Sequence, residues 1–415
     1  MKTIIILGDG MADNPIEKLG GKTPLQYART PYMDLLAKQG VVGRLVTVPE
    51  GYMPGSEVAN TAILGYDLDK VYEGRGPLEA ASIGYDMAED DLALRCNIIY
   101  VNDGKIITHN GGDLSTEDSG PLIDLLNERL GTDKVKWIRG IQYRHLLIIK
   151  GGSKHIMCNP PHDHPNEEWR PLLVSPLEGM ADYKEEGRMT PQETADLLND
   201  LILKSVEVLA EAPLNIKRKA EGKRLANIIW PWSGGYRPAM QTLMEQYASI
   251  KTGAVISAVD LIQGIGKYAG LDIIKVEGAT GLWDTNYEGK TQAAIEQLKQ
   301  KDFVFLHVEA SDEAGHDGDV DLKVKTIENL DSRMVGPIYE AVKQWDEPVC
   351  IAVLPDHYTP VEMRIHVGEP VPFIIYYPGI KADAVQTYDE FTAVEGSCGV
   401  LRLQEFMQKL SKIGN

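Results

Sequence analysis

Cysteine and long apolar runs are scarce in this chain of 415 residues. It has four cysteines, Cys96, Cys158, Cys350 and Cys398, and no two of them have the CxxC spacing of a zinc or redox motif. Cys96 and Cys350 lie in apolar runs, where we expect buried, reduced thiols. No stretch stays apolar for the roughly 20 residues that a membrane-spanning helix needs, and we expect no signal peptide. We therefore predict a cytoplasmic protein without disulfides or membrane contact.

Positive charge is scarce as well. The chain has 42 Lys and Arg against 61 Asp and Glu, which gives a formal net charge of -19. Such a field repels nucleic acids and anionic membranes, so we expect neither as a partner. An anionic substrate would need metal ions or arginines placed locally to offset the field.

The chain is long enough for two domains or for one domain with a large insertion. From about Ser82 the strand-like runs are short, and an irregular stretch rich in Pro, Gly and His follows at Gly151–Met189. From Ile250 onward, apolar strands alternate with helical patterns, which predicts a doubly wound, mostly parallel α/β sheet. We therefore expect a catalytic domain formed by residues 1–83 and 184–415, with a smaller α+β domain inserted at residues 84–183.

Acidic residues and histidines lie beside the predicted strands of this sheet. Asp9 follows a strand at residues 2–7, and the apolar run Phe303–Val308 leads into a turn that carries Asp312 and His316. Further along, Asp356 and His357 follow residues 349–354, and His366 precedes the strand at residues 371–376. Ligand sites in such sheets gather at the carboxyl ends of the strands. Carboxylate and imidazole donors suit Zn²⁺ or Mn²⁺, so the pattern predicts a two-metal site.

Ser56 stands at the start of a helical pattern, directly after a Pro54-Gly55 turn. The free amides at a helix N-terminus favour a phosphate or an anionic oxygen. An ordinary N-cap serine is the commoner use of this position, so these residues alone leave both interpretations open. The nearby Gly20–Thr23 segment is not a nucleotide-binding P-loop, because Ile16 stands where that motif needs a glycine.

The roles of two further polar segments remain open. A basic cluster spans residues 217–224 and suits either a phosphate or a solvated surface. The loop sequence His162-Asp163-His164 has the ligand types of a metal site, but no fourth ligand stands at a known spacing. Its role is open.

Nine segments carry a family resemblance that covers nearly the whole chain. They are ILGDGMAD, GGKTPLQYARTPYMDLLAKQG, PGSEVANTAILGYD, GRGPLEAASIG, LRCN, YRHLL, EASDEAGHDGD, PDHYTP and RIHVGEPVPF. In this order they resemble the alkaline phosphatase superfamily, and within it the archaeal-type cofactor-independent phosphoglycerate mutases.

This resemblance implies a dimetal phosphoryl-transfer enzyme that converts 3-phosphoglycerate to 2-phosphoglycerate in glycolysis, with Ser56 as the nucleophile that becomes phosphoserine. One metal would be held by Asp9, Ser56, Asp356 and His357. The other would be held by Asp312, His316 and His366. The metal would be Mn²⁺ or Zn²⁺, with Mg²⁺ as a third candidate. The substrate, a small phosphorylated or hydroxylated metabolite, would contact Arg144, His145, Asn215 and Arg218. The chain is compatible with a homo-oligomer.

Two segments depart from the family pattern. Trp230–Gly235 replaces an Arg-Gly-Ala-Gly type loop, and Thr108–Asp113 replaces an Asp-Arg-x-Ala-Gly-Arg type segment. Arginines suit carboxylates and phosphates by bidentate pairing, so their loss bears on the substrate rather than on the chemistry. The Trp-Pro-Trp form also resembles a bacterial branch proposed to be homoserine kinases. An ATP-dependent homoserine kinase of threonine biosynthesis is therefore the alternative function.

Overall fold

The computed structural model describes residues 1–412, and the chain divides into two compact units. The first unit combines Met1–Tyr72 with the chain from Ala239 onward, and the second is Glu73–Pro238. The inserted unit is longer than the expected 84–183. It includes β9 (Ile228–Gly235), which pairs with β3 (Asp91–Asn102), and α7 (Pro191–Ala210), which packs against β9. Strand pairing therefore moves the second boundary beyond residue 183.

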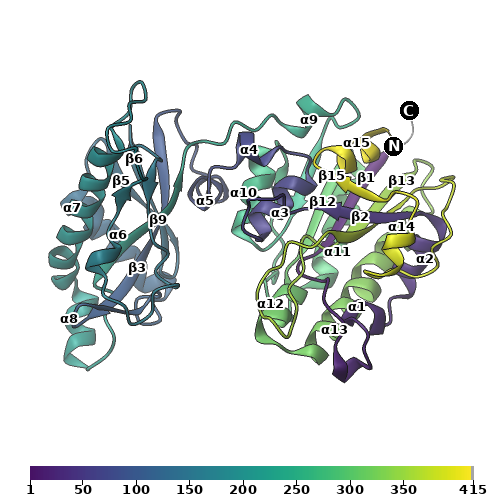
Figure 1. Ribbon diagram of the computed structural model, residues 1–415, viewed down its shortest axis with the longest axis horizontal. Coiled ribbons are helices and arrows are strands. Elements are labelled where there is room, and N and C mark those ends of the chain that lie inside the picture. The colour runs from purple at the N-terminus through teal and green to yellow at the C-terminus, as the bar shows by residue number, and fades with distance from the viewer. Residues whose placement is uncertain (413–415) are drawn as a thin grey trace. The chain divides into compact units, whose positions relative to one another are not determined.

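The first unit is built on an eight-stranded sheet. Its strands, in order across the sheet, are β11 (Asp272–Ile274), β10 (Gly253–Ile256), β12 (Phe303–Val308), β1 (Lys2–Gly8), β13 (Val349–Leu354), β14 (Val371–Tyr376), β2 (Val41–Val46) and β15 (Val400–Arg402). β14 runs antiparallel to both of its neighbours, and the other pairs are parallel. β12 and β13 are buried along their whole length, which explains their continuous apolar sequences. The predicted mixed α/β fold is confirmed (Figure 1).

Helices cover both faces of this sheet. On one face, a single core joins alternate residues of β1, β12 and β13 to α2 (Pro31–Gln39), α11 (Tyr287–Gln300), α13 (Val320–Leu330) and α14 (Gly336–Val342). A π-helical segment, Asp331–Val335, connects α13 to α14. On the other face, α10 (Asp260–Tyr268) brings Gly266 close to Val255 of β10, and Phe406 of α15 (Glu405–Lys412) contacts Phe373 of β14. Shorter helices in this unit are α1 (Pro24–Tyr27), α3 (Ser56–Ile63), α4 (Leu68–Val71), α9 (Leu243–Gln246) and α12 (Ala310–Asp317). The sheet is therefore doubly wound.

The second unit is an α+β structure. Its sheet consists of β3, β4 (Lys105–Thr108), β5 (Val135–Ile141), β6 (Arg144–Lys150) and β9, and a small hairpin pairs β7 (Ile156–Met157) with β8 (Ser175–Pro176). The helices are α5 (Arg75–Ser82), α6 (Thr116–Leu130), α7 and α8 (Pro213–Ala220). Thr190 and Glu193 form the capping box that begins α7. The sequence had suggested a loop at Trp230–Gly235. In the structure this segment is part of strand β9. Within residues 1–412 no helix is long and apolar enough to cross a membrane.

A buried ion pair fastens the two loops that follow β1 and β13. Lys323 is fully buried, and its Nζ lies 2.7 Å from Asp13 Oδ2. The same Nζ donates to the carbonyl oxygens of Ala12, at 3.3 Å, and Thr359, at 2.7 Å. One ammonium group therefore ties both loops to α13.

Replacing Lys323 with Met should destabilise the first unit by about 3–5 kcal/mol, because it leaves the Asp13 carboxylate buried without its cation. Urea unfolding followed by circular dichroism would measure the loss. Lys18→Met is the matched control, because the Lys18–Asp321 pair, at 2.6 Å, has both side chains more than half exposed. An equal effect of the two substitutions would contradict the assigned role of Lys323.

Candidate functional site

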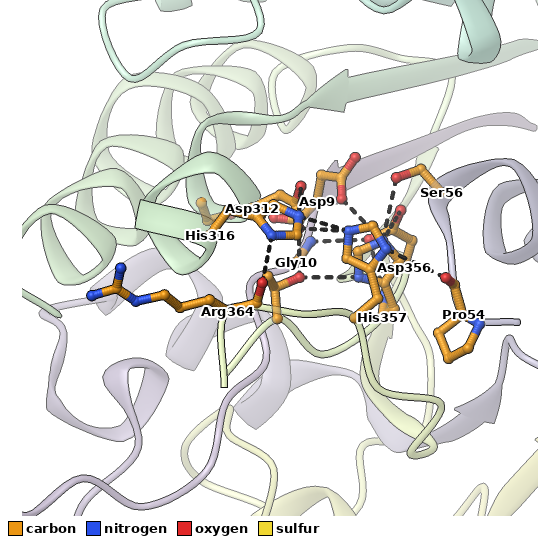
Figure 2. A network of polar contacts seen from close by, with 12 residues as sticks. Asp9, Gly10, Pro54, Ser56, Asp312, His316, Asp356, His357 and Arg364 are labelled. Atoms are coloured by element: carbon orange, nitrogen blue, oxygen red, sulfur yellow. Dashed lines mark hydrogen bonds and ion pairs between the residues drawn. The ribbon is translucent and has the colours of Figure 1, made fainter. Parts of the chain in front are cut away.

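Polar side chains converge where three neighbouring strands end. β12, β1 and β13 are adjacent and parallel, so their carboxyl ends meet at one edge of the sheet. Asp9 follows β1, Asp312 and His316 lie in α12 after β12, and Asp356 and His357 follow β13. Figure 2 shows these side chains pointing toward one another, with Ser56 beside them. The structure thus brings together the residues that the sequence predicted for a metal site.

Asp312, His316 and His366 form one half of the cluster. The segment after β12 is helix α12 and not the expected turn, so Asp312 and His316 lie one helical turn apart on the same face. The Nε2 of His316 is 3.2 Å from Asp312 Oδ2, and the Nε2 of His366 is 3.4 Å from Asp312 Oδ1. The two Nε2 atoms are 2.9 Å apart.

The other nitrogen of each of these imidazoles faces a carbonyl oxygen. His316 Nδ1 is 3.0 Å from the Arg364 oxygen, and His366 Nδ1 is 3.4 Å from the Pro54 oxygen. A carbonyl only accepts hydrogen bonds, so each Nδ1 carries a hydrogen. Once a ring loses its second proton, its Nε2 lone pair faces Asp312. Two lone pairs facing one another beside a carboxylate require a proton or a cation between them.

His357 is oriented in the same way. Its Nδ1 is 3.2 Å from Thr359 Oγ1, whose hydroxyl donates to Asp312 Oδ1 at 2.5 Å. Since the Thr359 hydrogen is used, the hydroxyl accepts from His357 Nδ1 and leaves Nε2 with a free lone pair. This Nε2 is 3.2 Å from Ser56 Oγ, 3.5 Å from Asp9 Oδ1 and 3.6 Å from Asp356 Oδ2.

Asp9 and Asp356 bring two more carboxylates, and both are fully buried. Asp356 Oδ1 accepts from the backbone amides of Gly10 and His357, and Oδ2 accepts from Asn60. Asp9 Oδ1, by contrast, is buried without a hydrogen-bond partner. Burial raises the pKa of Asp9 well above its usual value, and the charges of Asp356 and Asp312 raise it further.

These donors fit divalent metal ions. Two sets, Asp312/His316/His366 and Asp9/Asp312/His357, each hold their donor atoms within 4.8 Å of one another. The unpartnered Asp9 oxygen and the convergent lone pairs are what a cation would satisfy. The Asp312 hydrogen bond raises the pKa of His316 to about 9 despite burial, so a proton occupies part of this site when no metal is present.

Ser56 is the first residue of α3 and not its N-cap. Gly55 occupies the cap position, and no side chain caps the helix there. The interpretation of Ser56 as an ordinary N-cap is therefore excluded. Asn60 donates to both the Ser56 carbonyl and Asp356 Oδ2, at 2.8 Å each, and so fixes the start of α3 to the carboxylate cluster.

Three of the predicted substrate residues have structural roles in the second unit. His145 is buried, its Nδ1 accepts from the Gly140 amide, and burial lowers its pKa to about 3. The Asn215 side chain bonds to backbone atoms of Leu209 and Ala226. Arg218 donates to the Gly111 carbonyl. These contacts hold the unit together, and the expectation that the three residues also contact substrate stays a prediction; Arg218 lines a cavity with Lys217 and Arg224.

Arg144 is different, because its guanidinium is partly exposed. Its nearest ring is that of Tyr143, with 5.9 Å between the guanidinium carbon and the ring centroid. Nearby, the Arg95 guanidinium lies 4.6 Å from the centre of the Trp232 ring. Burial lowers the pKa of Arg95, Glu79 opposes this, and the charges of Arg75 and Arg144 lower it further. Three arginines therefore lie near one another, with Arg75 and Arg144 partly exposed and Arg95 buried against Glu79.

Among residues 1–412 the His162–His164 loop gains no fourth ligand and forms no possible metal group. His162 makes an edge-on ring contact with Trp232, and His164 Nδ1 lies 3.1 Å from Glu167 Oε2. In the part of the chain that the structure describes, every group able to hold a metal lies in the first unit. His307, a buried residue of β12 that contacts Asp9, was not predicted from the sequence. Its signal was a single histidine within an otherwise apolar strand.

The fold and the donor set together define a class: α/β proteins with buried sites for divalent cations next to a serine, as in metal-assisted phosphoryl transfer. The family is given by comparison with known proteins. A family profile described as 2,3-bisphosphoglycerate-independent phosphoglycerate mutase matches residues 37–215. A relative with that name from Methanosarcina barkeri is 47% identical and covers 99% of this chain and 100% of its own. A relative named as a probable enzyme of this kind, from Geobacter sulfurreducens, is 44% identical. The match covers 98% of this chain and 99% of the relative.

Solved structures agree with this result. The PH0037 protein from Pyrococcus horikoshii is 31% identical, with a TM-score of 0.81 and 98% and 96% of the two chains covered. The cofactor-independent phosphoglycerate mutase from Thermoplasma acidophilum is 25% identical, with a TM-score of 0.70 and 100% of both chains covered. The chain belongs to the 2,3-bisphosphoglycerate-independent phosphoglycerate mutase family, a family of enzymes, and the predicted resemblance is confirmed.

Binding of a divalent cation should release protons. Because the pKa of His316 is raised to about 9, this imidazole is protonated at neutral pH in the metal-free protein and must lose its proton to bind. Apparent affinity for Mn²⁺ should therefore rise with pH up to about 9. Titration calorimetry at pH 7.5, in two buffers of different ionisation enthalpy, would count the protons released. Heats that do not depend on the buffer would contradict the assignment.

Proposed function

We propose that this protein is a 2,3-bisphosphoglycerate-independent phosphoglycerate mutase that converts 3-phosphoglycerate to 2-phosphoglycerate through a phosphoserine at Ser56. The observation that carries the proposal is the position of Ser56 Oγ, 3.2 Å from the unprotonated Nε2 of His357 and at the start of a helix. The names of the relatives support the substrate. The comparisons give no support to the alternative, an ATP-dependent homoserine kinase.

The two predicted ligand sets suit two divalent cations. We assign Asp9, Ser56, Asp356 and His357 to one cation, and Asp312, His316 and His366 to the other. When bound, the cations would neutralise phosphoryl oxygens and lower the pKa of the serine hydroxyl. Carboxylate and imidazole donors accept Mn²⁺, Zn²⁺ or Mg²⁺, with the imidazoles favouring the first two.

The reaction then has two phosphoryl-transfer steps, the first to Ser56 and the second from Ser56 back to the substrate. In the first, Ser56 Oγ gives up its proton and forms a bond to phosphorus, the bond from phosphorus to the 3-oxygen breaks, and that oxygen takes up one proton to give glycerate. In the second, the 2-hydroxyl of glycerate gives up its proton and its oxygen bonds to phosphorus, the bond from phosphorus to Ser56 Oγ breaks, and Ser56 Oγ takes up one proton. Neither step needs an external phosphate donor. The amides of the first turn of α3 have no intrahelical acceptor and can stabilise the charge that develops on the phosphoryl oxygens.

Arg144 is the residue that we assign to the substrate carboxylate. A guanidinium pairs bidentately with a carboxylate, and that of Arg144 is partly exposed near Arg75 and Arg95. The free thiols of all four cysteines support the expected cytoplasmic location. We expect a small phosphorylated metabolite as the only ligand besides the metal ions.

Ser56→Ala should reduce formation of 2-phosphoglycerate by a factor on the order of 10³ or more, because no other group replaces the nucleophile. The assay is ³¹P NMR of 3-phosphoglycerate with Mn²⁺ and without ATP or bisphosphoglycerate, and mass spectrometry locates the phosphoryl group. Ser332→Ala, at an exposed serine, is the control. Full activity of Ser56→Ala would refute the phosphoserine mechanism. ATP consumption that depends on homoserine would favour the kinase instead.

Arg144→Ala should raise KM for 3-phosphoglycerate by roughly 10–100-fold, the size of a lost charge-assisted hydrogen bond, and Arg144→Lys should recover part of the loss. Steady-state kinetics with saturating Mn²⁺ would measure both variants. Arg139→Ala is the matched control, because Arg139 is an exposed arginine of the neighbouring strand that is paired with Asp124. An unchanged KM in Arg144→Ala would remove Arg144 from the substrate site.

A further inference from the structure

We propose that His307 is a positioning residue: it fixes one oxygen of Asp9 so that the other is presented to a divalent cation. The inference rests on the proposed metal sites. His307 is a fully buried residue of β12 and stands in register with Leu7 of the neighbouring strand β1. Asp9 lies just beyond the end of that strand, so the pairing of β1 with β12 holds the two side chains together.

His307 belongs to a series of hydrogen bonds that runs from the Val259 amide through Ser257 to Asp9. The Val259 amide donates to Ser257 Oγ at 3.0 Å, and Ser257 Oγ lies 3.1 Å from His307 Nδ1. On the other side of the ring, His307 Nε2 lies 2.8 Å from Asp9 Oδ2. Ser257, His307 and Asp9 are all buried, so water does not replace a missing partner.

The geometry sets the position of each hydrogen. Unlike His316 and His366, His307 has no carbonyl oxygen beside Nδ1 to hold a hydrogen there, and its Nε2 lies 2.8 Å from Asp9 Oδ2. With Asp9 ionised, His307 Nε2 therefore carries a hydrogen and donates it to the carboxylate. Nδ1 of the neutral ring is then an acceptor. The Ser257 oxygen already accepts from Val259, and its hydroxyl hydrogen completes the chain by donating to Nδ1.

His307 is thus oriented in the opposite sense to the other histidines of the cluster. His316, His357 and His366 donate through Nδ1, so their Nε2 atoms face the carboxylates and offer lone pairs once deprotonated. His307 donates through Nε2 and accepts through Nδ1 on the far side of the ring, so it has no lone pair facing the cluster, although it lies close enough to count among the possible donors. It therefore acts through Asp9 and does not bind the cation itself.

The consequence is an Asp9 carboxylate with two distinct oxygens. Oδ2 is held by His307, and the peptide oxygen of Asp9 is held by Ser311 Oγ at 2.6 Å. Oδ1 is left buried without a hydrogen-bond partner, 3.5 Å from His357 Nε2. A carboxylate fixed at one oxygen and free at the other is what a rigid metal ligand requires.

The test compares His307→Leu with His307→Gln. Leucine keeps the volume and removes the donor, whereas the glutamine amide can still donate to Asp9. Mn²⁺ affinity is measured for the whole protein without substrate, by electron paramagnetic resonance of free Mn²⁺. We expect one of the two sites in His307→Leu to lose 10–100-fold in affinity, roughly the effect of removing a hydrogen-bond partner of a ligand. His307→Gln should keep most of it. Val304→Ala, a core substitution in the same strand, should lower stability and leave affinity unchanged.

A second measurement separates positioning from ligation. ¹⁵N NMR of the histidine rings, with and without Zn²⁺, should show His307 keeping its Nε2 hydrogen when the metal is bound. Loss of that hydrogen on Zn²⁺ binding would make His307 a ligand and overturn the proposal. So would equal Mn²⁺ affinity in His307→Leu and the wild type. A wild type that binds no Mn²⁺ would instead refute the proposed function.

Discussion

The structure depends on one electrostatic constraint: the first unit buries three carboxylates, Asp9, Asp312 and Asp356, at one edge of its sheet. Burying like charges together is costly unless they are paired or bind a cation. Backbone amides satisfy one of these groups, since Asp356 accepts from Gly10 and from His357. The remaining charge is balanced by imidazoles that are fixed by carbonyl and hydroxyl oxygens. The site is therefore stable only as a unit that holds protons or cations, and this property also makes it suited to neutralising a phosphoryl group.

The surrounding fold supplies the rigidity that such a cluster needs. The ligands follow adjacent parallel strands, whose spacing is set by backbone hydrogen bonds. Lys323 ties the loops after β1 and β13 to α13, and Asn60 ties α3 to Asp356. Neither residue belongs to the proposed ligand sets, yet both determine where the donor atoms lie. The polar residues buried around the site are in this sense part of its geometry.

Much of this could be predicted from the sequence, and the exceptions have physical reasons. β12, β13 and β14 were predicted with their observed bounds, because a buried strand is a short apolar run between polar breaks. Their ends located the metal ligands. The helix after β12 was missed because the polar, glycine-containing segment Glu309–Asp319 has no apolar periodicity. The substrate roles of His145 and Asn215 stay predictions, because a polar residue that bonds to buried backbone looks, in sequence, like one that binds a substrate. Only the hydrogen-bond partners distinguish the two.

The structure gives a different meaning to the arginines that are missing from the Trp230–Gly235 segment. In the sequence, replacement of an arginine loop by Trp-Pro-Trp suggests that a substrate contact has been lost. In the structure this segment is β9, and Trp232 provides a ring on which the Arg95 guanidinium rests, while its indole Nε1 donates to Asn97. A stacked arginine keeps its charge and is held in one orientation at low entropic cost. Arg95, Arg75 and Arg144 lie close enough for their charges to interact. Arg95 itself is buried and paired with Glu79 at 3.0 Å, so the partly exposed positive charge here comes from Arg75 and Arg144. An anionic substrate remains compatible with a chain that lacks the usual arginine loop.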